Sequence, residues 1–197
     1  MIVNWPERFY CNSPVRRLQQ MLEARRWLRL RPLPPGADIL EIGCGNGSGG
    51  DVINALFRPR RFLALDLDPA MLRPAARRLG PQGIGVIRAD AQHLPVATAS
   101  VDAVFNFGII HHLEDWRQGI AEVSRVLRPG GAFYFEEIFA ALYANAFWRH
   151  IVAHPTQDRF QGLQFRQALA HNGLTLLPGA RESRLTILGV AQKREDA

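Results

Sequence analysis

Short apolar runs alternate with amphipathic segments along most of this 197-residue chain, and this alternation constrains the fold more than any other feature. Short apolar runs predict strands, and apolar residues at helical spacing predict helices between them. Strand–helix alternation of this kind predicts a parallel sheet with helices on both faces. The expected strands cover residues 38–42, 61–66, 84–88, 101–107, 132–136, 174–177 and 185–191, and the expected helices cover 50–57, 69–79, 116–127 and 161–171.

The last two expected strands do not fit a parallel arrangement, because only residues 178–184 separate them. A crossover between parallel strands needs about a dozen residues or more, whereas an antiparallel pair needs only a short turn. We therefore expect an α/β fold: a seven-stranded, mostly parallel sheet that ends in a C-terminal antiparallel β-hairpin.

The segment before the alternation predicts one further helix, over residues 13–31. Ser13 can cap it, Pro14 suits its first position, and a proline-rich stretch ends it. Its apolar residues recur at helical spacing, so we expect an amphipathic helix that either covers a substrate or only packs on the domain. This divides the chain into residues 1–36, a helix with a linker, and residues 37–197, the main domain. The apolar residues are Val15, Leu18, Met21, Leu22 and Leu28.

Positive charge is concentrated in the same N-terminal segment. The net charge of the chain is +6, and residues 1–37 hold seven arginines but only Glu7 and Glu23 as acidic residues. A basic helix can contact an anionic partner, such as a membrane surface, or it can present a solvated face. The chain has 23 arginines and one lysine, which is also typical of a biased base composition, so both interpretations stay open.

The overall composition excludes several classes of protein. Hydrophobic residues make up 47% of the chain, yet no apolar run reaches the roughly 18 residues of a membrane-spanning helix. The N-terminus lacks the pattern of a secretory signal, and Cys11 and Cys44 form neither a disulfide framework nor a metal-ligand set. We therefore predict a cytoplasmic protein with no metal site.

A glycine-rich turn follows the first strand of the main domain, in the stretch Asp38-Ile-Leu-Glu-Ile-Gly-Cys-Gly-Asn-Gly47. Glycines permit the sharp turn and the close approach of a ligand, and the N-terminus of the next helix offers free N–H groups. Asp66 ends the second strand, where a carboxylate can accept the hydroxyls of a ribose. These features predict a Rossmann-like nucleoside site. Residues 45–50 also satisfy G-x-G-x-x-G, so a nicotinamide cofactor is an alternative.

A set of motifs in a fixed order distinguishes these alternatives. Together they resemble the class I S-adenosylmethionine-dependent methyltransferases of the small-molecule type, over about residues 36–137. The resemblance implies that S-adenosylmethionine is the cofactor and that the chain is a methyltransferase. The motifs are Glu41-x-Gly43-x-Gly45-x-Gly47, residues 64–72, Ala89-Asp90-Ala91 with Leu94-Pro95, residues 100–113 and residues 122–131.

The resemblance implies roles for the glycine-rich turn and the second strand. Gly43 and Gly45 would let the backbone approach the methionine portion of the cofactor, and Glu41 would help to hold its amino group. Asp66 would bind the ribose hydroxyls. Asp68 stands where many relatives have serine, and we expect it to cap the helix that follows.

Further roles follow for the adenine and for the end of the fourth strand. Leu67 and Met71 would pack against the adenine, with simple core packing as the alternative. Asp90 would accept a hydrogen bond from the adenine amino group, and the Ala91 N–H would donate to a ring nitrogen. The carbonyl of Asn106 would face the cofactor's ammonium group.

A general base is needed only if the methyl acceptor must lose a proton. The candidates are His111 and His112 after the fourth strand, and Glu136 and Glu137 after the fifth. Both groups lie at carboxyl ends of strands, where a parallel sheet binds its ligands. We favour His111 with Glu137 as a catalytic pair, with a structural role for these residues as the alternative.

The acceptor itself is constrained only by exclusion and by size. The sequence has no Asn-Pro-Pro-Tyr-like motif at 106–109 and no Pro-Cys pair, so base methylation of nucleic acid is disfavoured. Residues 138–155 are rich in aromatics and could form a lid over the site or an additional packing helix. We predict a small, apolar or amphiphilic acceptor. An RNA or protein acceptor, or a cofactor-binding module without turnover, remains an alternative.

Overall fold

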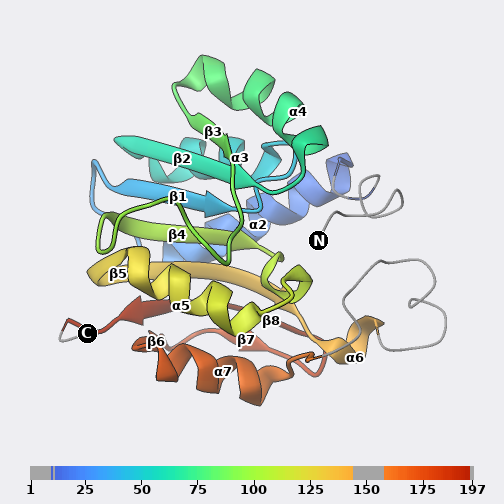
Figure 1. Ribbon diagram of the computed structural model, residues 1–197, viewed down its shortest axis with the longest axis vertical. Coiled ribbons are helices and arrows are strands. Elements are labelled where there is room, and N and C mark those ends of the chain that lie inside the picture. The colour runs from blue at the N-terminus through green and yellow to red at the C-terminus, as the bar shows by residue number, and fades with distance from the viewer. Residues whose placement is uncertain (1–9, 11, 144–157, 196–197) are drawn as a thin grey trace.

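The computed structural model describes residue 10, residues 12–143 and residues 158–195, which form a single sheet covered by helices on both faces (Figure 1). Eight strands are present in the described residues, in the order β3-β2-β1-β4-β5-β8-β6, with β7 also paired to β8. The strands are β1 (Asp38–Ile42), β2 (Arg61–Asp66), β3 (Gly85–Arg88), β4 (Val101–Phe107), β5 (Leu127–Ile138), β6 (Leu174–Leu176), β7 (Arg181–Glu182) and β8 (Thr186–Lys193).

The first five strands are parallel, and β8 is antiparallel to β5, β6 and β7. The predicted α/β fold with its antiparallel C-terminal strands is therefore confirmed. The count of seven strands needs correction, because the connection 178–184 contains the two-residue strand β7. β5 also begins at Leu127, earlier than expected, because the residues before Ala132 continue the strand past an irregularity in the β4–β5 register.

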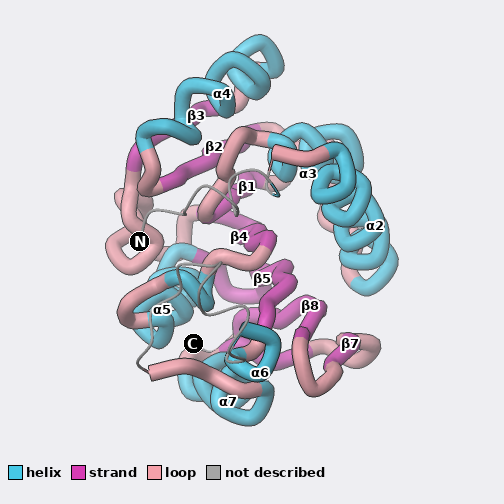
Figure 2. The backbone as a smooth tube through the Cα atoms, turned by 90° about the vertical axis from the view of Figure 1, so that its right-hand side faces the viewer, coloured by secondary structure: helices cyan, strands magenta, loops and turns pink. Residues whose placement is uncertain are grey.

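Helices cover the two faces of the sheet in two groups (Figure 2). One hydrophobic cluster joins the sheet to α2, α3 and α4, and a second joins it to α5 and α7. The helices are α2 (Pro14–Leu30), α3 (Ser48–Phe57), α4 (Pro69–Leu79), α5 (Trp116–Val126), α6 (Ala140–Tyr143) and α7 (Gly162–His171), with the 3₁₀ turns η1 (Gly80–Gln82) and η2 (Ile110–His112).

The N-terminal helix α2 begins as the sequence predicts. Ser13 is the N-cap, its hydroxyl accepts a hydrogen bond from the Arg16 N–H at 3.2 Å, and Pro14 follows it. Its buried face differs from the prediction. The buried side chains are those of Arg16, Gln20, Glu23, Ala24 and Trp27.

Only part of the expected apolar face of α2 packs on the domain, through Met21 and Leu28. Val15, Leu18 and Leu22 are among the most exposed large apolar side chains of the described residues. The helix is anchored instead by Trp27, which is fully buried and lies 4.8 Å from the ring of Phe107 between ring centroids. A buried tryptophan removes a large apolar area from water. Burial of Trp27 therefore favours the orientation in which this face of α2 turns inward.

Candidate active site

The glycine-rich turn joins β1 to α3 through three residues with positive φ. These are Gly43, Gly45 and Gly47, with φ values of 68°, 53° and 82°. A Cβ at Gly43 would lie 2.2 Å from the Ile109 side chain, so this glycine lets the turn after β4 pack against the turn after β1. A Cβ at Gly45 would meet nothing within 4 Å, so the backbone there faces open space where a ligand can approach it.

Asp66 ties the glycine-rich turn to the end of β2. Its carboxylate accepts hydrogen bonds from the backbone N–H groups of Gly45 and Asp68, both at 2.8 Å. Burial raises the pKa of Asp66, and the backbone donors oppose this shift. These two hydrogen bonds leave further lone pairs on the carboxylate, which can accept hydrogen bonds from the ribose hydroxyls of a cofactor. Asp68 caps α4 as predicted, because its side chain accepts from the Ala70 N–H at 2.9 Å.

Glu41 lies under the first turn of α3. Its side chain is nearly fully buried, and its oxygens would lie 2.4 Å and 2.9 Å from a Cβ at Gly49 and Gly50. Burial and the charge of Asp66 raise the pKa of Glu41 well above its ordinary value. Its Oε2 atom has no hydrogen-bond partner among the described residues. A cationic amino group near Glu41 would favour the ionised form of this buried carboxyl group, which agrees with the predicted role of Glu41 toward the cofactor's amino group.

The residues expected to hold the adenine follow β2 and β3. Leu67 is partly buried and Met71 is buried at the start of α4. Asp90 follows β3 and accepts a hydrogen bond from the Gln92 N–H at 2.9 Å, and Ala91 is buried in the cluster beneath α5. These four residues lie at the carboxyl end of the sheet. Their roles toward the adenine stay predictions.

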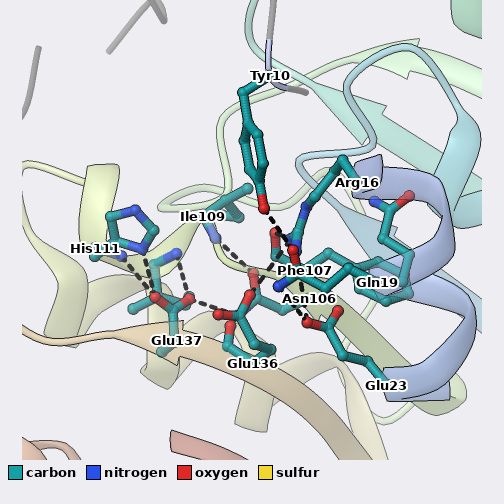
Figure 3. Close-up of polar contacts among 12 residues, drawn as sticks. Tyr10, Arg16, Gln19, Glu23, Asn106, Phe107, Ile109, His111, Glu136 and Glu137 are labelled. Atoms are coloured by element: carbon teal, nitrogen blue, oxygen red, sulfur yellow. Dashed lines mark hydrogen bonds and ion pairs between the residues drawn. The ribbon is translucent and has the colours of Figure 1, made fainter. Parts of the chain in front are cut away.

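The end of β4 is fixed to the end of β5 by side chains (Figure 3). Asn106 is fully buried, and its amide donates to Glu137 Oε1 at 2.6 Å and accepts from the Ile109 N–H at 2.8 Å. Glu137 also accepts from the N–H groups of Ile110 and His111, at 2.8 Å and 3.3 Å. The Asn106 side chain therefore shapes the turn, and the role of its backbone carbonyl toward the cofactor stays a prediction.

His111 and Glu137 lie in direct contact in this turn. His111 Nδ1 is 2.6 Å from Glu137 Oε2, and both residues are buried (Figure 3). Burial raises the pKa of Glu137 to about 7, although hydrogen bonds from Asn106, Ile110 and His111 oppose the shift. Burial lowers the pKa of His111 to about 3, and the cations of Arg159 and Arg16 add to this effect. The imidazole is therefore neutral at pH 7, with its Nδ1 proton held by the carboxylate.

A second group of charged side chains joins α2 to the same edge of the sheet. Arg16 Nη2 donates to the Phe107 carbonyl at 2.7 Å and lies 3.4 Å from Glu136 Oε2. Arg16 Nη1 lies 3.5 Å from Glu23 Oε1. Burial, followed by the charge of Glu136, raises the pKa of Glu23 to about 7. Burial likewise raises the pKa of Glu136. The carboxyl groups of Glu23 and Glu136 both lie beside the Arg16 guanidinium.

The glycine-rich turn is also contacted from the N-terminal segment. Asn46 donates to Asn12 Oδ1, and the Ser48 hydroxyl donates to Gln20 Oε1, each at 2.6 Å. These contacts and the Arg16 cluster were not among the predicted features of the site. The sequence does contain one indication of the buried face of α2. Trp27 is the only tryptophan in α2, and helical spacing places Arg16 and Gln20 on the same face as Trp27.

Part of the predicted lid lies outside the described residues. Phe139 is buried in the core beneath α5 and α7, and Tyr143 ends α6. Phe147, Trp148 and the histidines nearby fall in 144–157, beyond what the structure describes. Arg159 follows that segment and donates to the His111 carbonyl at 2.7 Å.

Neither a membrane-spanning helix nor a metal-binding group occurs in residue 10, residues 12–143 and residues 158–195. No helix there is both long enough and apolar enough to cross a membrane. No group of three or more His, Cys, Asp or Glu side chains there could hold a metal ion.

Comparison with known proteins identifies the core of the chain. Residues 40–135 match the family model of a methyltransferase domain. This match includes the glycine-rich turn, Asp66, Asp90 and Asn106, which are the residues that line the carboxyl ends of the first four strands. Residues 40–135 therefore belong to a class I S-adenosylmethionine-dependent methyltransferase domain. The predicted cofactor, S-adenosylmethionine, is thereby confirmed.

Two curated methyltransferases resemble this methyltransferase domain in sequence. The chain is 35% identical over 103 residues to the phthiotriol/phenolphthiotriol dimycocerosates methyltransferase of Mycobacterium tuberculosis, a match that covers 52% of this chain and 38% of that protein. It is 36% identical over 102 residues to the fatty-acid O-methyltransferase of Mycolicibacterium smegmatis, covering 52% and 37%. The matched segments therefore span well under half of these relatives.

Solved structures share the fold over nearly the whole chain. An S-adenosylmethionine-dependent methyltransferase from Aquifex aeolicus superposes with a TM-score of 0.74 at 16% identity, covering 96% of this chain and 98% of that one. At this identity the likeness concerns the fold alone. It extends beyond residues 40–135 and supports the inclusion of α2 and the C-terminal strands in the same architecture.

Proposed function

We propose that the protein transfers a methyl group from S-adenosylmethionine to a small, apolar or amphiphilic acceptor whose accepting group must lose a proton. The His111–Glu137 contact at the carboxyl ends of β4 and β5 carries this proposal. A carboxylate that holds one imidazole nitrogen fixes the orientation and the tautomer of the ring, which is the arrangement of a general base.

The cofactor would be held by the residues that follow β1, β2 and β3. The open backbone at Gly45 and the partnerless Glu41 oxygen fit its methionine portion, and Asp66 fits its ribose. When bound, S-adenosylmethionine supplies an activated methyl group on a sulfonium. The protein then needs mainly to position the acceptor, because the methyl donor requires no further activation.

In the proposed mechanism His111 takes the acceptor's proton at Nε2. Glu137 accepts a hydrogen bond from the Nδ1–H group throughout. This bond fixes the tautomer and stabilises the imidazolium as it forms. Asn106 and the N–H groups of Ile110 and His111 hold Glu137 in place, so the pair has one orientation. Burial lowers the pKa of His111, so proton uptake by this imidazole depends on the charge of Glu137, which favours the imidazolium and opposes the effect of burial.

The names of the curated relatives support an apolar acceptor, because they refer to fatty acids and to phthiotriol dimycocerosates. Among the described residues, α2 and the turn after β4 lie at the site, and we expect them to contact the acceptor. A cytoplasmic location stays a prediction.

The test is a methyl-transfer assay with isotope-labelled cofactor. The acceptors offered are fatty acids, long-chain alcohols, structured RNA and a protein extract. We expect product from an apolar small molecule, at a rate that His111→Gln lowers without weakening the binding of S-adenosylhomocysteine. Product from RNA or protein alone would refute the acceptor class. Binding of S-adenosylhomocysteine without turnover on any acceptor would indicate a binding module instead.

A further inference from the structure

The outward face of α2 carries a stripe of exposed aliphatic side chains, here called the outer stripe. It consists of Val15, Leu18 and Leu22, which are 67%, 62% and 58% exposed. Spacings of three and four residues place the three side chains on one face of the helix. Single exposed leucines are common on protein surfaces, but an uninterrupted row on one helix marks an interaction surface.

The same face becomes cationic along the helix. Arg25 and Arg29 follow Leu22 at helical spacing and are exposed. The only acidic residue in the α2 sequence is Glu23, and it is buried against the sheet with Arg16. The outward face therefore combines exposed aliphatic side chains with positive charge, and an anionic bilayer surface can bind both.

The position of the outer stripe links it to the active site. Figure 2 shows α2 as the outermost helix on its side of the sheet. Arg16 lies between Val15 and Leu18 in sequence and reaches the Phe107 carbonyl at the end of β4. The same turns of α2 therefore present the outer stripe on the outside and Arg16 on the inside. A surface that holds this stripe would lie beside the edge of the sheet where the acceptor reacts.

We propose that the outer stripe docks the protein on an anionic lipid surface, from which it takes its acceptor. This inference rests on the proposed function, because an apolar acceptor is found in such a surface. Val15, Leu18 and Leu22 would enter the acyl boundary, while Arg25 and Arg29 would contact the phosphate groups of lipids.

The test is flotation of the full chain with vesicles of phosphatidylcholine, or of equal parts phosphatidylcholine and phosphatidylglycerol. We expect the protein to float with the mixed vesicles and far less with phosphatidylcholine alone. Leu18→Ser with Leu22→Ser should weaken binding by about tenfold or more, since both aliphatic anchors are lost. Arg25→Gln with Arg29→Gln should weaken it on the mixed vesicles only, and added salt should have the same effect.

Leu163→Ser is the matched control. Leu163 is 59% exposed in α7, on the opposite face of the sheet, and its loss should leave vesicle binding unchanged. Equal binding by the Leu18/Leu22 variant would refute the proposal. A lower melting temperature of that variant would also refute it, because the stripe would then be covered within the protein. A dimer that the variant converts to monomer would assign the stripe to a second copy.

Failure here is separable from failure of the proposed function. Binding of S-adenosylhomocysteine by calorimetry and turnover of a short, soluble acceptor do not require a bilayer. If the protein binds S-adenosylhomocysteine and methylates a soluble acceptor but does not bind vesicles, only the docking proposal is refuted.

Discussion

Glu137 is the residue on which the proposed site depends most. Its two oxygens accept hydrogen bonds from the Asn106 amide, two backbone N–H groups and His111 Nδ1. Four donors stabilise the carboxylate, whereas burial favours the neutral acid and raises its pKa to about 7. The balance between the two makes the charge state of the pair sensitive to pH in the neutral range.

Glu137→Gln and His111→Gln should each lower kcat by about 10²–10⁴-fold, because each removes proton transfer by the pair. In the wild type, the pair should gain one proton as the pH falls through about 7, and kcat should fall with it. The profile should level off above that range and should flatten in Glu137→Gln. Steady-state rates measured across pH decide the matter. A wild-type profile without an acid limb, or full activity in either variant, would contradict the assignment.

Asp66→Ala should weaken S-adenosylhomocysteine binding by about 1–3 kcal/mol, because charge-assisted hydrogen bonds to the ribose are lost. Titration calorimetry measures this directly. Asp51→Ala is the control, since Asp51 pairs with Arg17 on the outside of α3. A neutral result for Asp66→Ala would place the ribose elsewhere.

The residues of the site were predictable only where local sequence places them. His111 and Glu137 follow strands directly, so the strand pattern predicts that they meet. Arg16 is 91 positions from Phe107 and 120 from Glu136, and its contact depends on how α2 packs. Nothing in the sequence near Arg16 indicates that partner.

At the scale of elements, α2 shows how apolar spacing can mislead. The leucines of this helix repeat at helical spacing, yet the helix turns Leu18 and Leu22 to the outside and buries Trp27. Apart from the short elements α6 and β7 and the early start of β5, the strands and the other helices lie within a few residues of the predicted ranges, because their apolar residues contact the sheet directly. α2 packs over α3 as well as over the sheet, and its inner face is half polar because it also reaches the site.

Trp27→Ala should destabilise the protein by about 3–5 kcal/mol, because it leaves a large cavity among Phe105, Phe107 and Tyr134. Leu18→Ala, in the same helix, should change stability by about 0.5 kcal/mol or less, since its side chain is exposed. Urea denaturation compares the two. Equal losses would show that the orientation of α2 is different from the one described.

Glu23→Gln should stabilise the protein relative to the wild type increasingly as pH rises. The pKa of Glu23 is raised to about 7 in the folded state, so its contribution to stability is fully present below its ordinary pKa and is lost as pH rises through about 7. The difference in unfolding free energy between variant and wild type should grow by about 1–3 kcal/mol from acid to mildly alkaline pH. Denaturation at several pH values tests this, with Glu182→Gln as an exposed control. A constant difference would mean that Glu23 stays ionised beside Arg16.

At the scale of the molecule, the N-terminal helix and the sheet pack together, and we expect them to unfold as one cooperative unit. Trp27 belongs to the same hydrophobic cluster as β1, β4 and β5, and Gln20 accepts a hydrogen bond from Ser48 at the start of α3. The proline-rich linker that ends the N-terminal helix predicts a division into residues 1–36 and 37–197. The composition changes there because of the proline-rich linker, although packing continues across it.

S-adenosylhomocysteine should therefore protect α2 from hydrogen exchange as well as the glycine-rich turn. A ligand at about 100 times its Kd stabilises the folded state by about 2.7 kcal/mol. If the amides around Trp27 exchange only through global unfolding, their exchange should slow by the same factor, about 100-fold. Exchange mass spectrometry with and without ligand measures this, and Asp66→Ala at the same ligand concentration is the control. Rapid, ligand-independent exchange in α2 beside protected strands would show instead that the helix opens separately from the sheet.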